Sequence, residues 1–88
     1  MDRILPPSHS EAAMPELIER ADGTIEARLG SRWYKYRITY SEHERLYRIW
    51  SYNRSEYISL YGNQTWLTNS GVRQTLMNWL RRCQERSL

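Results

Sequence analysis

The chain has 88 residues, 40% of them hydrophobic and 26% charged, with a net charge of +3 and a single cysteine. These values exclude a disordered chain and a disulfide-stapled fold, and no apolar run approaches the roughly 18 residues that a membrane span needs. The N-terminus lacks the apolar core of a signal peptide, so we expect a small, basic, cytoplasmic protein with one domain.

Basic residues concentrate in the later part of the chain. Residues 1–30 hold three arginines and six acidic residues, whereas residues 31–88 hold ten basic and four acidic residues. Twelve of the thirteen basic residues are arginine, which stacks on rings and binds phosphate through a planar fork. This bias favours an anionic partner, although a genome rich in arginine codons would produce it as well.

The N-terminal part of the chain carries two competing signals. Residues 1–9 contain two consecutive prolines, which predict a flexible tail. In residues 10–22, a capping-box pattern ahead of an apolar stripe favours a short helix that Gly23 ends. The alternative is an extra strand, because Asp22-Gly23 is a strong turn signal that would pair LIER with TIEAR as a hairpin.

Residues 24–61 have the composition of a sheet. They hold four runs rich in β-branched and aromatic residues, TIEARL, RWYKYRITY, RLYRIWSY and SEYISLY. Residues 70–86 have a helical period instead, with Asn69 or Ser70 as the N-cap. The apolar stripe of this helix is Val72, Leu76, Trp79, Leu80 and Cys83. We therefore predict one α+β domain over residues 10–88, a four-stranded antiparallel meander with the C-terminal helix packed on one face.

Turn lengths predict how the four strands pair. The expected loops are two residues at 30–31, four residues at 41–44 and two residues at 53–54. They place Ile25 opposite Tyr36, and they place Ile49 opposite both Tyr36 and Ile58. Alternation then gives one face an apolar core. Its members are Ile25, Ala27, Leu29, Tyr34, Tyr36, Ile38, Tyr47, Ile49, Ile58 and Leu60.

The other face of the predicted sheet combines rings with cations. Its members are Arg28, Trp33, Lys35, Arg37, Arg48, Trp50, Tyr52, Tyr57, Ser59 and Tyr61. The expected register sets Lys35 opposite Trp50 and Arg37 opposite Arg48. Two like charges across a ladder are destabilising, so a bound anion would make sense of the pair. Rings interleaved with cations are how open sheets bind single-stranded nucleic acid, where each stacked base is worth about 1–3 kcal/mol.

The sequence therefore predicts a binding protein that holds single-stranded DNA or RNA on this face. The candidate site is Trp33, Lys35, Arg37, Arg48, Trp50, Tyr52, Tyr57 and Tyr61, with rings stacking on bases and cations holding phosphates. The alternative is a regulatory or adaptor protein that uses the same face to bind an acidic protein or a second copy of itself. A third interpretation is structural, with the N-terminal segment folded over these side chains.

Catalytic and metal chemistry have little support in the sequence. His43 lies in a turn, and the second histidine is in the expected tail, so metal ligands are too few. Cys83 falls on the apolar helix stripe, where a buried thiol is inert. With two aspartates and four scattered glycines, neither a catalytic triad nor a phosphate-binding loop is indicated. We expect no catalytic residues, no metal and no cofactor.

Overall fold

The computed structural model describes residues 16–87, so the predicted tail and the first part of the predicted N-terminal helix lie outside the described residues. Five strands form one antiparallel sheet in sequence order, and one helix follows them. The elements are β1 (Glu16–Glu19), β2 (Thr24–Leu29), β3 (Arg32–Ser41), β4 (Leu46–Ser51), β5 (Glu56–Tyr57) and α2 (Asn69–Ser87). The predicted α+β class is confirmed, with five strands in place of four.

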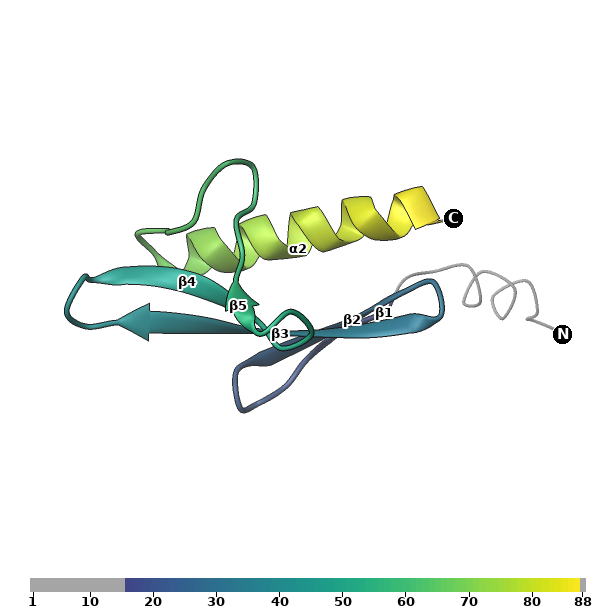
Figure 1. The fold of residues 1–88 in the computed structure, drawn as a ribbon, viewed down its shortest axis with the longest axis horizontal. Helices are drawn as coiled ribbons and strands as arrows, with labels where there is room; N and C mark the ends of the chain where they lie inside the picture. Colours follow the sequence, from purple (N-terminus) through teal and green to yellow (C-terminus); the bar gives the residue numbers. More distant parts are fainter. Residues whose placement is uncertain (1–15, 88) are drawn as a thin grey trace, which may run out of the picture.

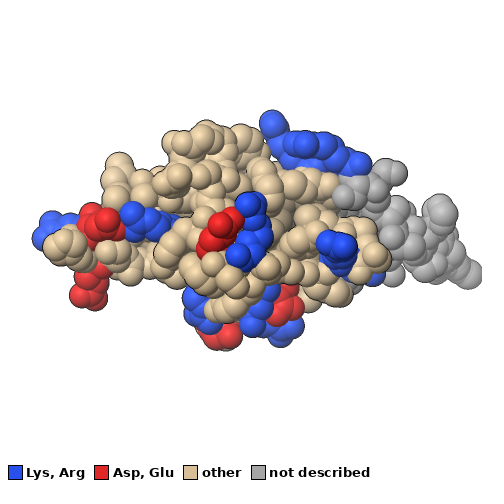
Figure 2. Space-filling view, in the orientation of Figure 1, with Lys and Arg blue, Asp and Glu red and all other residues tan. Residues whose placement is uncertain are grey.

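The helix and the sheet form two layers. Figure 1 shows α2 lying along one face of the sheet, while no other described element lies over the opposite face. The two layers differ in how charge is distributed over their surfaces. In the space-filling view, basic side chains alone mark the C-terminal half of α2, whereas basic and acidic side chains are interleaved around the β1–β2 turn (Figure 2).

The extra strand β1 shows that the preferred N-terminal helix is wrong for residues 16–19 and that the hairpin is right. The turn has strong local chemistry. Gly23 has φ 93° and donates its N–H to the Arg20 carbonyl at 3.0 Å. Asp22 Oδ1 accepts hydrogen bonds from both the N–H and the hydroxyl of Thr24, at 3.0 and 2.7 Å. These bonds and the pairing with β2 outweigh the helical pattern.

The β2–β3 register is the predicted one, with Ile25 opposite Tyr36. The β3–β4 register differs from the predicted one, because the loop covers residues 42–45 and Ser41 pairs with Leu46. Arg45 has φ 60°, which a strand residue cannot adopt, so it stays in the turn. Pairing therefore shifts by two residues. A shift of two residues leaves each side chain on its predicted face, but each residue then pairs with a different residue across the β3–β4 ladder.

The β4–β5 register follows the prediction, since the Ile58 N–H donates to the Ile49 carbonyl at 3.0 Å. The turn itself spans residues 52–55, so it is longer than the predicted two residues. β5 ends at Tyr57, and the edge of β4 beyond it is completed by Trp66, which exchanges two backbone hydrogen bonds with Tyr47 at 2.8 and 2.9 Å. The predicted register, continued along β4, would place Leu60 opposite Tyr47, and this pairing is wrong because Trp66 occupies that position.

The first turn of α2 is capped by a residue that sequence reasoning missed. Thr68 Oγ1 accepts the Gly71 N–H at 2.9 Å, and the Thr68 carbonyl accepts the Val72 N–H at 3.1 Å. Asn69 and Ser70, the predicted caps, already lie inside the helix. Within residues 16–87, no helix has the length and the apolar run that a membrane crossing requires.

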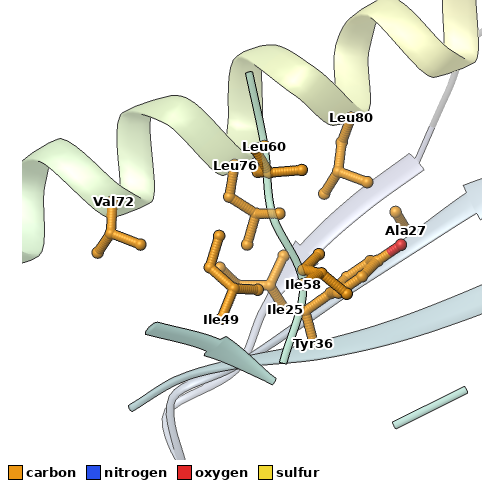
Figure 3. Close-up of a cluster of buried hydrophobic side chains, with 9 residues drawn as sticks. All are labelled: Ile25, Ala27, Tyr36, Ile49, Ile58, Leu60, Val72, Leu76 and Leu80. Carbon is orange, nitrogen blue, oxygen red and sulfur yellow. The ribbon is translucent and has the colours of Figure 1, made fainter. Parts of the chain in front are cut away.

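The core lies between α2 and the sheet face predicted to be apolar (Figure 3). Its buried members are Ile25, Ala27, Tyr36, Ile49, Ile58, Leu60, Val72, Leu76 and Leu80. The three helix residues recur every fourth position, so one stripe covers the sheet. Trp79 meets the Tyr36 ring edge-on, with centroids 6.5 Å apart. An ion pair between Arg73 and Glu19 ties α2 to β1.

Candidate functional site

Seven of the eight predicted site residues lie on the sheet face opposite α2. This aromatic face comprises Trp33, Lys35, Arg37, Arg48, Trp50, Tyr52 and Tyr57. The strand pairing aligns Arg37, Trp50 and Tyr57 in one row across β3, β4 and β5. Tyr52 lies in the following turn, and its hydroxyl oxygen accepts the Arg37 Nε–H at 2.8 Å. The face is therefore continuous from β3 to β5.

One end of the aromatic face is a ring pair with a cation beside it. Trp50 and Tyr57 meet nearly edge-on, with centroids 4.9 Å apart and an interplanar angle of 77°. The Arg48 guanidinium lies 5.9 Å from the Tyr57 centroid and is ion-paired with Glu44. Because Tyr57 is 53% exposed, its ring can meet a partner without any rearrangement of the pair.

The other end of the aromatic face is a groove of about 370 Å³. Its walls include Trp33 and Tyr52, which are 47% and 40% exposed. Lys35 Nζ lies 4.8 Å from the Tyr52 centroid, within the range of a cation–π contact. A concave site flanked by two exposed rings suits a flat guest, either an aromatic side chain or a base.

Asn53 shapes this groove, and sequence reasoning treated it only as a turn residue. Its Oδ1 accepts the Lys35 N–H at 2.8 Å, and its Nδ2 donates to the Trp33 carbonyl at 3.1 Å. β4 ends before it reaches this part of β3, so the carboxamide supplies the donor and acceptor that another strand would have supplied. Only the three-dimensional path of the chain shows this role.

Acidic residues of the same chain neutralise much of the aromatic face. Arg37 Nη1 donates to the Asp22 carbonyl at 2.8 Å, and Arg37 Nη2 lies 4.0 Å from Asp22 Oδ2. Glu26, opposite Lys35 on β2, is bound by Arg20 at 2.9 Å. The predicted pairing of Arg37 with Arg48 is wrong.

With the observed register, Arg37 lies opposite Trp50 and Arg48 lies opposite Thr39. The like-charge repulsion that called for a bound anion is therefore absent between these two arginines. The β2–β3 register was predicted correctly, so the Glu26–Lys35 neighbours could have been found from the sequence.

The three carboxylates beside the face are held ionised. The hydroxyl and amide of Thr24 hydrogen-bond to Asp22 and lower its pKa. A hydrogen bond from Arg20 lowers the pKa of Glu26, and one from Arg48 lowers that of Glu44. Negative charge therefore persists on this surface at neutral pH.

Tyr61, the eighth predicted residue, lies apart from the aromatic face. Its ring lies beside α2, where the Arg82 guanidinium is 5.9 Å from the ring centroid. The chain leaves the sheet after β5, so strand alternation no longer decides where this side chain points. The prediction that Tyr61 shares a surface with the other seven residues is wrong.

The remaining reactive groups do not converge. Cys83 is half-buried, and burial raises the pKa of its thiol. Across residues 16–87, no three side chains of histidine, cysteine, aspartate or glutamate gather in a way that could hold a metal ion. Comparisons with protein-family models, curated proteins and solved structures found no match for this chain.

Proposed function

We propose that this chain is a non-catalytic binding protein and that its aromatic face binds the surface of another protein molecule. The observation that carries the proposal is the pairing of exposed rings with cations that already have partners in the chain, Arg37 with Asp22 and Arg48 with Glu44. Tryptophan, tyrosine and arginine are the residues enriched at the centres of protein interfaces. A phosphate backbone instead requires cations that are free to replace its counterions.

The mixed charges fit a second copy of the same chain. A two-fold axis places one patch against itself, so the patch must complement itself. A purely basic face would repel its copy, whereas a face that alternates Arg37 and Arg48 with Asp22, Glu26 and Glu44 can exchange ion-pair partners across the interface. An acidic protein partner has less support, because these carboxylates would oppose it.

A second candidate function is the binding of single-stranded nucleic acid on the same face. The observation in its favour is the groove between Trp33 and Tyr52, which could accept one base between its rings. Lys35 forms no ion pair within the described residues, but it lies opposite Glu26, so a phosphate at that end would compete with this carboxylate for the ammonium group. Among the described residues that line this groove, Lys35 is the single cation, which is why we rank the candidate second.

Sedimentation equilibrium of the full chain tests the first proposal. We expect association in the micromolar range that Tyr57→Ala weakens. Tyr40→Ala is the matched control, because Tyr40 is 49% exposed but lies on the other face of the sheet, beside Tyr47. If both variants associate as the wild-type chain does, the aromatic face is not the contact. A monomeric chain that binds an oligonucleotide through Trp33 would support the second candidate.

A further inference from the structure

A second surface feature lies on the opposite layer, between the turn at residues 60–63 and α2. It is a groove of about 440 Å³, here named the helix groove. Its lining residues are Tyr61, Thr75, Asn78, Arg81, Arg82 and Glu85. Apart from the tyrosine ring the lining is polar, so the helix groove offers no apolar pockets for the side chains of a protein ligand.

The backbone at Tyr61 is strained, and packing does not explain the strain. Leu60 and Asn63 exchange two backbone hydrogen bonds of 2.9 Å, and the residues between them, Tyr61 and Gly62, have φ of 53° and 81°. Two central residues with positive φ define the type I′ turn, which favours Asn-Gly. A bulky residue in the left-handed region is uncommon and tends to mark a functional position. Since Tyr61 is 55% exposed, burial does not select it.

The cations of the helix groove form no ion pairs with other residues of the part of the chain that the structure describes. Among residues 16–87, the arginines at 20, 37, 48, 54 and 73 each pair with a carboxylate. Within this range no such pair forms at Arg81 or Arg82, which line the groove, or at Arg86 nearby on α2, and Glu85 is the one acidic residue in the described lining. In the view of Figure 2, basic side chains and no acidic ones mark the C-terminal half of α2. The helix dipole favours cations there, but it does not account for the ring beside them.

We propose that the helix groove binds single-stranded nucleic acid, one nucleotide unit at a time. The guanidinium forks of Arg81 and Arg82 would hold a phosphate, because planar donors match phosphate oxygens in pairs. One face of the Tyr61 ring meets Arg82, and its exposed remainder would stack on a base. This inference goes beyond the proposed function, since it assigns a different ligand to a different layer of the molecule.

Fluorescence anisotropy of a labelled oligothymidylate titrated with the full chain tests the proposal. At low salt we expect binding that Arg82→Gln weakens about fivefold or more, with the salt dependence falling by about 0.7 in slope for each lost phosphate contact. Tyr61→Asn keeps the turn and removes the ring, so it should weaken binding about fivefold or more, while Tyr61→Phe should leave binding unchanged. Glu85→Gln should tighten binding, because it removes the negative charge from the lining.

Arg32→Gln is the matched control, since it makes the same charge change at the start of β3, away from the helix groove. An equal loss of affinity in Arg32→Gln and Arg82→Gln would overturn the proposal, because binding would then follow total charge alone. Absence of binding at low salt would overturn it as well. If Trp33→Ala lost binding and Tyr61→Asn kept it, the proposal would also be overturned. The oligonucleotide would then be assigned to the aromatic face. None of these results depends on whether the chain self-associates.

Discussion

Tyr36 shows how burial on one face of the sheet changes the chemistry of a single residue. Tyr36 is 4% exposed, under α2, and desolvation raises the pKa of its hydroxyl to about 12. A buried phenolate would have to give up its hydration, so the protonated form is favoured in the folded state. Sequence alternation predicted this burial correctly, because the β2–β3 register was right.

The pKa of Tyr36 predicts a loss of stability in alkali. The folded pKa lies above the ordinary value of 10, so the unfolded chain releases its proton first. The free energy of unfolding should then fall by about 1.4 kcal/mol per pH unit between pH 10 and about pH 12. Denaturant melts across this range would measure the slope. In Tyr36→Phe, which keeps the ring against Trp79, this component should vanish. An unchanged slope would assign the loss to other groups.

The strain at Tyr61 predicts a trade-off between stability and binding. Tyr61→Asn creates the Asn-Gly dipeptide that a type I′ turn favours, so it should raise the free energy of unfolding by roughly 0.5–1 kcal/mol. The same change removes the exposed ring of the helix groove. Thermal unfolding measures the first effect, with Tyr61→Phe as the control that keeps the strain. A less stable Tyr61→Asn variant would show that the tyrosine ring stabilises the fold.

At the scale of elements, turns decided which sequence-based predictions succeeded. The two-residue loop after β2 gave the right register because Gly30 takes φ 66° at low cost. The loop after β3 misled the prediction, because Arg45 takes a positive φ that favours glycine and nothing in the sequence marks it. The error of two residues kept every face intact. It placed Arg37 opposite Trp50 and not opposite Arg48, so the repulsion that argued for a bound anion is absent.

The start of α2 provides a test of one element. A Cβ added at Gly71 would lie 2.8 Å from Thr68 Oγ1, so Gly71→Ala must displace the capping hydroxyl. Thr68→Ala should cost about 1 kcal/mol of stability. In that background, Gly71→Ala should become stabilising, because alanine is the better helix former and the clash is gone. A double-mutant cycle in urea measures the coupling. Additive effects would contradict the assigned cap.

At the scale of the whole molecule, charge is sorted between the two layers. The aromatic face holds arginines that are paired with acidic residues of the same chain, whereas the arginines of the helix groove form no such pairs within residues 16–87. The sequence predicted the α+β class, the apolar face and seven of the eight residues that share the second face. It could not predict the separation of Tyr61 or the role of Asn53, because both depend on loops that follow no strand period.

Paired carboxylates also predict how the fold responds to acid. The pKa values of Asp22, Glu26 and Glu44 are lower in the folded chain than their ordinary values. Their contribution to stability is therefore present above about pH 4 and is lost as the pH falls through the folded pKa values. Thermal melts from neutral to acidic pH should show this loss. The loss of stability in acid should be smaller in Asp22→Asn than in Glu42→Gln. The second variant is the control, because it changes an exposed carboxyl in the β3–β4 turn. Equal profiles would contradict the role of Asp22.

The most direct test of the central claim is sedimentation equilibrium of the full chain at low and at moderate salt, with Tyr57→Ala measured beside it. The contact would bury rings whose neighbouring charges are already paired within the chain. We therefore predict self-association that changes little with salt and that weakens in Tyr57→Ala. A chain that remains monomeric at both salt concentrations, or an association that collapses with added salt and ignores Tyr57→Ala, would contradict the assignment of the aromatic face as a protein interface.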